Sequence, residues 1–501
     1  MNARSRVDSY FWMAFFIGLA VRLAVVPFTM TDEADAVTRI FITQEWMRDP
    51  GIIYHGVWGP LQTYFIALSL VVWDNPVYSP VILNCIFSAA AAIPLYYFVK
   101  REWDEKPALF AACLYLVYPV AFRYGFFALS DVPFIFFISL GMLLLSLARD
   151  AGGNWKHAAL AGITVTLAGA LRYEAWGLTP FLGLLLWKKW REMFLFYLSA
   201  AVFPVFWMTG NYLYSGDPFY SFNFALDWTL NISQNDVNVS TIEYVNRATY
   251  FPRVLFFGLT PIAFLVCILG MFYAVQRWKK QAIWLLPLAA LFGTFTINAV
   301  SGKLSTQVRY SLTLAIFMIP FAAEWFERMK DSPRRTLYSA VVIASMIPLG
   351  FLRAMIPWQF DFPNPIPRQV SYLPRLSRET VNISTDLNRH LANHPGGLIL
   401  DFYDWGDTYY IALMTGKHKS NIYMTPGEVN EPMKPDEVEA FLLENPKGVV
   451  LLTETPRFLQ VEAGDEGPLL RIIGTDRTLH IREIGGVEGQ RVFAYSVNAE
   501  D

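Results

Sequence analysis

Long apolar runs separated by short polar turns make up the first 350 or so residues of the chain. A helix needs about 20 apolar residues to cross the hydrocarbon layer of a bilayer. By this criterion the pattern predicts about eleven membrane-spanning helices. The runs cover residues 10–29, 80–99, 107–122, 132–148, 158–170, 175–187, 194–212, 254–275, 282–299, 310–326 and 336–352.

The basic residues predict how these helices are oriented. Every second connection between the runs is rich in Lys and Arg, and cytoplasmic loops of membrane proteins carry such an excess. Because Arg4 and Arg6 precede the first run, we expect the N-terminus inside the cytoplasm and the C-terminus outside. The basic connections are Lys100 to Lys106, Arg149 to Lys156, Lys188 to Arg191, Arg277 to Lys280 and Arg328 to Arg335.

Residues 58–73 form one further apolar segment, inside the first outer loop. If this segment crossed the membrane, the basic turn Lys100-Arg101 would lie outside the cytoplasm, against the rule that basic turns lie inside. We therefore expect a helix that lies in, or dips into, the outer membrane interface, which suits its aromatic ends. The first outer loop, residues 31–79, is then a structured unit.

The composition changes after Arg353. Five prolines between residues 357 and 375 predict an extended linker, which we place at 353–395. Beyond it, the pattern predicts a small soluble α/β domain at 396–501 on the outer face. Its expected elements are strands at 398–400 and 449–452, a helix at 434–444, and a hairpin with strands 479–484 and 491–497 around Gly485-Gly486.

The predicted fold class is therefore an α-helical polytopic membrane protein with a transmembrane module at 1–352 and an extracytoplasmic C-terminal domain. Composition agrees, because a chain that is 54% hydrophobic and only 16% charged is too apolar for a soluble protein. The three cysteines, Cys85, Cys113 and Cys267, lie in apolar runs and are expected to be packing residues. No phosphate-binding loop, dinucleotide turn or nucleic-acid patch is found, so we expect no nucleic-acid partner.

The first candidate for chemistry is the acidic cluster Thr31-Asp32-Glu33-Ala34-Asp35, directly after the first run. Carboxylates at a membrane boundary are costly and are commonly functional. The following residues have helical spacing up to Met47, so Asp32 could instead be the N-cap of that helix. Because capping needs only one carboxylate and three are present, the cluster favours a functional site.

Charged residues recur in three further outer turns. Each alone could be an N-cap, as at Asp131, or an interface ion pair. Together they indicate a site for an anionic lipid headgroup, in which cations bind a phosphate and a carboxylate acts as a base. The residues are Arg123 with Asp131, Arg172 with Glu174, and Lys303 with Arg309 and Tyr310.

These motifs resemble the glycosyltransferase-C superfamily, in particular the protein O-mannosyltransferases and the bacterial aminoarabinose and lipopolysaccharide-core transferases. In that superfamily an Asp-Glu pair opens the first outer loop, as Asp32-Glu33 does here. Its His/Lys-Pro-Pro-Leu motif is similar to the segment from His55 to Pro60-Leu61. Its Arg-x(6)-Asp/Glu motif is similar to Arg123 and Asp131, with one extra residue between them.

The resemblance implies transfer of a sugar, with inversion, from a polyprenyl-phosphate-linked donor to an extracytoplasmic protein, lipid or glycan acceptor. It implies that Asp32 is the general base, that Glu33 and Asp131 are secondary acids, and that the site lies on the outer face of a plasma or inner membrane. Four cations are then candidates for binding the donor phosphate: Arg309, Lys303, Arg172 and Arg123. Four further residues are candidates for the acceptor and donor pocket: Asp35, His55, Glu174 and Tyr310.

Three questions stay open from the sequence. Members of the superfamily differ in metal dependence, and Asp32, Glu33, Asp35 and Asp131 would supply the hard oxygen ligands of a divalent cation. A lipid or sugar transporter is an alternative function, although ionisable residues gather at the outer ends of the runs and not near mid-membrane. A non-catalytic scaffold with an outer interaction domain is another alternative function. It gives the acidic cluster no role.

Overall fold

The structure is a computed structural model, and two compact units make up the chain. The first contains residues 1–28, 52–64 and 81–374, and the second contains residues 29–51, 65–80 and 375–501. The residues that the structure describes are 3–29, 33–150, 154–232, 240–276, 280–304, 306–355, 372, 378–401, 405–424, 435–454, 456, 458–464 and 467–498.

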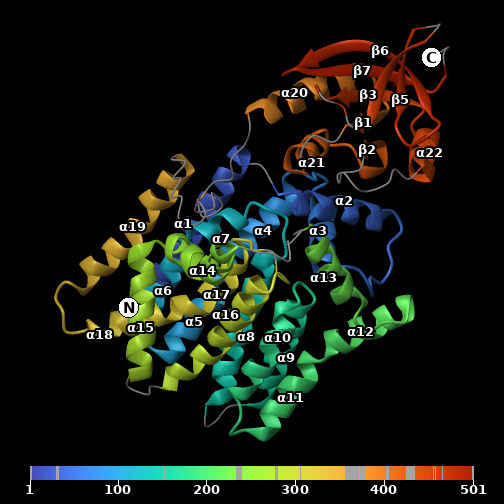
Figure 1. Cartoon of the computed structure of the whole chain (residues 1–501). Coiled ribbons are helices and arrows are strands. Elements are labelled where there is room, and N and C mark those ends of the chain that lie inside the picture. Colours follow the sequence, from blue (N-terminus) through green and yellow to red (C-terminus); the bar gives the residue numbers. More distant parts are fainter. Residues whose placement is uncertain are drawn as a thin grey trace. The chain divides into compact units, whose positions relative to one another are not determined.

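Helices build the first unit (Figure 1). Two helices, α3 (Leu61–Val72) and α4 (Ser79–Ala90), contain residues of both units. The others are α1 (Ala3–Val25), η1 (Val26–Phe28), α5 (Ala92–Glu102), α6 (Glu105–Leu116), α7 (Pro119–Tyr124), α8 (Asp131–Arg149), α9 (Trp155–Gly169), α10 (Glu174–Leu184), α11 (Trp190–Ala200), α12 (Val202–Ser215), α13 (Tyr220–Ile232), α14 (Thr241–Gly258), α15 (Pro261–Gln276), η2 (Lys280–Trp284), α16 (Leu285–Val300), α17 (Tyr310–Met318), η3 (Ile319–Phe321), α18 (Ala322–Arg328) and α19 (Arg335–Met355).

Five of the described helical segments are long and apolar enough to cross a membrane, and the chain is an integral membrane protein. The pair α14 and α15, bent by 111° at the break between them, would make a sixth. The number of about eleven spans remains a prediction, because many described helices are short or interrupted. The orientation of the helices remains a prediction as well. The five segments are Arg6–Phe28, Ser79–Glu102, Asp131–Arg149, Trp190–Ser215 and Lys280–Val300.

Small residues let the central helices pack closely. On α8, Phe134, Ile138, Met142 and Leu145 recur at helical spacing and are buried. The neighbouring α9 carries Gly162, where an added Cβ would overlap the backbone of α11. Close approach of this kind, at glycine and alanine, is how helices associate when lipid removes most of the hydrophobic driving force.

A buried arginine connects α1 to its neighbours. Arg22 is fully buried, and its Nε donates to Ser88 Oγ at 3.1 Å while Nη2 donates to the Leu116 carbonyl at 3.0 Å. Its Nη1 donates to the Gly18 carbonyl, one turn earlier in α1, at 3.1 Å. Because an unsatisfied charge is costly in a membrane span, these bonds fix α1 against α4 and α6.

A seven-stranded mixed sheet forms the core of the second unit, with strand order β2-β1-β3-β7-β6-β5-β4 (Figure 1). β1 pairs in parallel with β2 and β3, and the remaining pairs are antiparallel. The sheet confirms the strands expected at 398–400 and 449–452. The strands are β1 (Gly397–Leu400), β2 (Ile422–Met424), β3 (Lys447–Leu452), β4 (Leu459–Gly464), β5 (Gly467–Ile472), β6 (Thr478–Val487) and β7 (Gln490–Ser496).

The predicted hairpin exists, but the expected turn is wrong. Gly485 and Gly486 lie inside β6, where they pair with Val492 and Arg491 after a register shift that begins at Glu483. The turn is at Glu488-Gly489, and both residues have positive φ values of 49° and 80°. Two consecutive positive φ angles are what a tight hairpin turn needs, so the glycine pair marks an irregular strand instead.

The described residues after 375 also form three α-helices of the second unit: α20 (Arg378–Asn393), α21 (Trp405–Met414) and α22 (Pro435–Glu444). The last confirms the helix expected at 434–444. The predicted linker at 353–395 is wrong for residues 378–393, which form α20 and bury Ile383, Leu387 and Leu391 at a spacing of four. The proline-rich segment before residue 378 led to the prediction of a linker in place of this amphipathic helix. Residues 356–371 and 373–377 of the predicted linker lie outside the described residues.

The first outer loop contributes a helix to the same unit. α2 (Ala34–Arg48) packs against α21 and against the short helix η5 (Lys419–Asn421). His418 Nε2 lies 3.2 Å from the Gln44 carbonyl oxygen of α2. The loop and the C-terminal domain, which the sequence treats as separate, thus share one compact unit. The segment 58–73 is helical as α3, and its place in the membrane interface remains a prediction.

Candidate active site

The central feature of the candidate site is an arginine between two carboxylates. Arg172, in the turn between α9 and α10, donates through Nη1 to Asp131 Oδ1. Its Nε and Nη2 donate to Glu174 Oε1 at 3.1 and 2.5 Å. Only 11% of the Arg172 side chain, 4% of Asp131 and 17% of Glu174 is exposed. We call these three residues the Arg172 triad.

The triad has more negative than positive charge. Burial by itself lowers the pKa of Arg172, but the Asp131 and Glu174 carboxylates outweigh it and raise that pKa above its ordinary value. The guanidinium therefore stays protonated. Asp131 Oδ2 is buried and makes no hydrogen bond with any described residue. The triad thus keeps one buried carboxylate oxygen that is able to accept a proton or a hydrogen bond.

Helix termini bring this triad together. Asp131 is the first residue of α8, and Glu174 is the first residue of α10. The loop before Asp131 is held by Asn84 of α4, whose Nδ2 donates to the Phe127 carbonyl and, at 2.8 Å, to the Leu129 carbonyl. The alternative in which Asp131 is only the N-cap of α8 is wrong, because Ser130 occupies the N-cap position and Asp131 binds Arg172.

A third turn adds aromatic and basic groups. The Arg172 guanidinium carbon lies 5.1 Å from the centroid of the Tyr310 ring, a cation–π distance. Tyr310 is the first residue of α17, and Arg309 directly before it is close enough to interact electrostatically with the Tyr310 hydroxyl. Three of the turns that the sequence nominated therefore converge on one place.

Two residues near this place were missed from the sequence. Tyr250 on α14 interacts electrostatically with Tyr310 and with Arg253, one turn further along the same helix. The available signal was the pair of arginines, Arg247 and Arg253, just before the apolar run at 254–275. Ionisable residues at the end of a membrane helix are functional candidates.

His55 lies in a separate aromatic group of the first unit. Its ring stacks on Tyr214 of α12 with centroids 3.7 Å apart, and it meets the Tyr54 ring edge-on at 4.7 Å. Burial lowers the pKa of His55, which favours the neutral imidazole near pH 7. The same loop is attached to the α9–α10 turn, since Leu61 N donates to the Ala170 carbonyl at 3.2 Å.

The first acidic cluster is only partly described. Asp32 lies outside the described residues, so its role as base stays a prediction. Glu33 occupies the N-cap position of α2, without a side-chain capping bond, and Asp35 lies in the first helical turn. The alternative in which Asp32 caps this helix is therefore wrong by one residue. Glu33 and Asp35 belong to the second unit.

The two remaining phosphate-binding candidates lie in different surroundings. Arg123 on α7 is buried, with its guanidinium carbon 5.5 Å from the Phe127 ring centroid. Lys303 is exposed in the turn after α16, and the described polar contacts of the Arg172 triad do not include it. Among the described residues, no three His, Cys, Asp or Glu side chains are grouped closely enough to hold a metal ion.

Comparison with known proteins agrees with the resemblance seen in the sequence. Residues 57–209 match the family described as dolichyl-phosphate-mannose-protein mannosyltransferase. The match covers α9 and the Arg172 triad, and it begins two residues after His55. A search among curated proteins finds no match.

Solved structures show the fold. ArnT from Cupriavidus metallidurans in the apo state matches with a TM-score of 0.67 and 12% identity, over 100% of this chain and 99% of that one. ArnT bound to undecaprenyl phosphate matches with a TM-score of 0.67 and 11% identity, over 98% of each chain. The Archaeoglobus fulgidus oligosaccharyltransferase AglB, in complex with an inhibitory peptide and a dolichol-phosphate, matches with a TM-score of 0.53 and 12% identity, over 89% of this chain and 69% of that one. The chain therefore has a glycosyltransferase-C type of fold, and the resemblance is confirmed.

Proposed function

We propose that this protein is an integral-membrane glycosyltransferase that uses a polyprenyl-phosphate-linked sugar. The observation that carries the proposal is the buried Arg172 triad, in a fold shared with proteins whose structures contain undecaprenyl phosphate or dolichol-phosphate. The proposed reaction is transfer of the sugar to a hydroxyl group of an extracytoplasmic acceptor.

In the proposed reaction, Asp32 removes the proton of the acceptor hydroxyl. The acceptor oxygen then attacks the anomeric carbon, and the bond from that carbon to the phosphate oxygen breaks, which inverts the configuration. The polyprenyl phosphate leaves with the bonding electrons. A positioned carboxylate base of this kind contributes about 10²–10⁴-fold to a rate.

The geometry supports different roles for the four candidate cations. Arg172 already gives three N–H groups to Asp131 and Glu174, so we assign it to positioning these carboxylates. Arg309 is the stronger candidate for the leaving phosphate, because it lies at the start of α17 next to Tyr310. A guanidinium is suited to this task through its planar set of donors. Asp131 Oδ2 is the proposed acceptor of a hydrogen bond from a sugar or acceptor hydroxyl.

The proposal is tested by the release of polyprenyl phosphate. Purified protein in nanodiscs is incubated with a panel of polyprenyl-phosphate sugars and extracts of candidate acceptors, and the freed lipid phosphate is measured by mass spectrometry. Transfer should depend on Asp131 and Arg309. In parallel, surface glycans and glycolipids of a deletion strain are compared with those of its parent. No turnover of any donor, together with identical glycans and glycolipids, would refute the proposal.

Topology gives a second test, because the proposed site needs the outer face of the membrane. A reporter fused after Arg353 should be active outside the cytoplasm, and one fused at Lys279 should be active inside. The opposite result would remove the extracytoplasmic acceptor from the proposal.

One feature favours the alternative of a transporter. The 111° bend between α14 and α15 resembles the broken helices from which transporters build their sites. Thr260 at the bend has a positive φ of 67°. Uptake of polyprenyl-linked sugar into proteoliposomes without sugar transfer would favour this function over the proposed one.

A further inference from the structure

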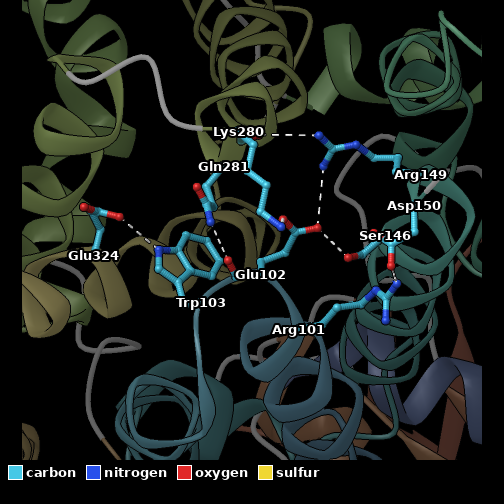
Figure 2. A network of polar contacts seen from close by, with 9 residues as sticks. All are labelled: Arg101, Glu102, Trp103, Ser146, Arg149, Asp150, Lys280, Gln281 and Glu324. Atoms are coloured by element: carbon cyan, nitrogen blue, oxygen red, sulfur yellow. Dashed lines mark hydrogen bonds and ion pairs between the residues drawn. The ribbon is translucent and has the colours of Figure 1, made fainter.

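A second polar cluster lies at the far end of α8. This helix runs from Asp131 to Arg149, so its two ends are about 27 Å apart at 1.5 Å per residue. At the end that carries Arg149, the buried carboxylate of Glu102 accepts a bond from Ser146 Oγ (Figure 2). Arg149 Nη1 lies 3.6 Å and Lys280 Nζ 3.9 Å from the Glu102 oxygens.

A cavity of about 530 Å³ lies beside this cluster. Four of its lining residues are cations, Arg149, Lys188, Lys189 and Lys280, and none is acidic. The remaining lining residues are apolar: Leu185, Leu186, Trp187, Ala282 and Ile283. The cavity thus combines a cationic wall with an apolar wall, at the end of the helical unit away from the Arg172 triad.

The protein itself neutralises only part of this charge. Lys189 Nζ donates to the Ala148 carbonyl at 2.9 Å and to the Asp150 carbonyl, which are neutral groups. The Asp150 carboxylate is paired with Arg101 (Figure 2). Glu102 is therefore the carboxylate shared by Arg149 and Lys280, and Arg149 Nη1 makes no hydrogen bond within the described residues. Within the described part of the chain, four cations line the cavity, and the Glu102 carboxylate pairs with two of them.

The surroundings of the cavity indicate a membrane interface. Trp187 and Trp190 are 61% and 76% exposed, and Trp155 is 41% exposed. Lys188 lies over the Trp187 ring at 5.0 Å, and Arg191 lies over the Trp155 ring at 5.9 Å. Exposed tryptophans next to basic residues are typical of the level of lipid headgroups. Basic pockets between membrane helices at this level bind anionic headgroups.

We propose that this cavity binds the phosphate group of an anionic ligand, with a phospholipid headgroup as the favoured source. The cationic wall would bind the phosphate, and the apolar wall with Trp187 would contact the adjoining glycerol and acyl carbons. The site differs from the proposed active site in position and in residues. It stands whether or not the protein transfers sugars.

The test compares two pairs of lysine and arginine changes in the full-length protein. Lys188→Gln with Lys280→Gln removes two cations that line the cavity. Lys156→Gln with Arg191→Gln removes two exposed cations near Trp155 that do not line it. Binding of phosphatidylglycerol to detergent-purified protein is measured by native mass spectrometry, with zwitterionic phosphatidylcholine as the reference that has no net charge.

Each cation near an anionic lipid surface contributes about fivefold in affinity, so the cavity pair should weaken phosphatidylglycerol binding about 25-fold. The control pair should change it by less than about twofold, since these two side chains are exposed to screening by salt and do not line the cavity. Inorganic phosphate is the second probe. Displacement of the lipid at millimolar phosphate would identify a soluble phosphate as the source, and no displacement would identify the lipid.

Hydrogen–deuterium exchange keeps the test independent of any folding defect. In the wild-type protein, phosphatidylglycerol should slow exchange at residues 185–189 and 280–284. No protection of these residues, or equal losses in the cavity and control pairs, would overturn the proposal.

Discussion

The Arg172 triad makes an unusual stability prediction, because one cation serves two carboxylates. Arg172→Met leaves Asp131 and Glu174 close together without their shared partner. Asp131→Asn and Glu174→Gln each leave one balanced ion pair. The three single changes should therefore differ in cost, because Arg172→Met removes the partner of both carboxylates whereas each carboxylate change removes only one ion pair.

The magnitudes follow from burial. Removing one partner of a buried ion pair costs about 3–5 kcal/mol, because the remaining charge stays desolvated. Arg172→Met should reach or exceed that range, since two carboxylates remain and only 4% and 17% of their side chains are exposed. Asp131→Asn weakens one charge-assisted hydrogen bond, but it also removes the excess negative charge of the triad. The net cost should therefore be about 1–2 kcal/mol. Glu174→Gln, at the more exposed site, should cost about 1 kcal/mol.

The decisive variant is the triple change Asp131→Asn, Arg172→Met and Glu174→Gln. It removes every charge of the triad, so it should be more stable than Arg172→Met alone by about 2 kcal/mol or more. Additive behaviour would instead make the triple variant the least stable of all. Arg191→Met, at an exposed arginine, is the matched control and should change stability by less than about 0.5 kcal/mol.

Unfolding free energies are measured for purified protein in mixed micelles, with increasing dodecyl sulfate and circular dichroism as the readout. Transfer activity is measured on the same samples. Asp131→Asn should lose activity while it remains folded. A cost below about 1 kcal/mol for Arg172→Met, or a triple variant less stable than Arg172→Met, would refute the charge argument.

Two further predictions concern the proposed reaction, and a third concerns the pH dependence of stability. Asp32→Asn should reduce transfer about 10²–10⁴-fold at unchanged detergent stability, whereas Asp35→Asn should have the smaller effect; full activity of purified Asp32→Asn protein would end its assignment as base. Arg309→Ala should raise the KM for the lipid-phosphate donor and Arg309→Lys should partly restore it, and equal activity of all three proteins would remove Arg309 from the site. Because burial lowers the pKa of His55 in the folded protein, stability should fall as the pH drops below the unfolded value of about 6.5. His55→Phe, which keeps the stack on Tyr214, should flatten that dependence in a pH series of unfolding midpoints, and an unchanged slope would exclude His55 as its source.

Local sequence patterns were sufficient for the class of fold. A long apolar run identified the helix Asp131–Arg149, and the strands at 398–400 and 449–452 were found from their apolar character. The charged turns were found in the same way, because a charge next to an apolar run stands out by itself. Patterns of this kind need only neighbours in the chain.

Contacts between distant residues were decided by the tertiary structure. Asp131 and Arg172 are 41 residues apart, and the sequence offered Arg123 as an equally good partner in the same motif. Packing of α8 against α9 brings the α9–α10 turn to Asp131, and this turns a candidate phosphate ligand into a shared partner of two carboxylates.

The C-terminal unit gives the same lesson for α20 and α2. The amphipathic spacing of Ile383, Leu387 and Leu391 stabilises a helix only when an apolar surface of the fold covers these side chains. Likewise, α2 joins the C-terminal unit through α21 and His418, far along the chain. Hydrophobic periodicity determines which elements form, whereas shape and charge complementarity between remote segments determine which side chains meet.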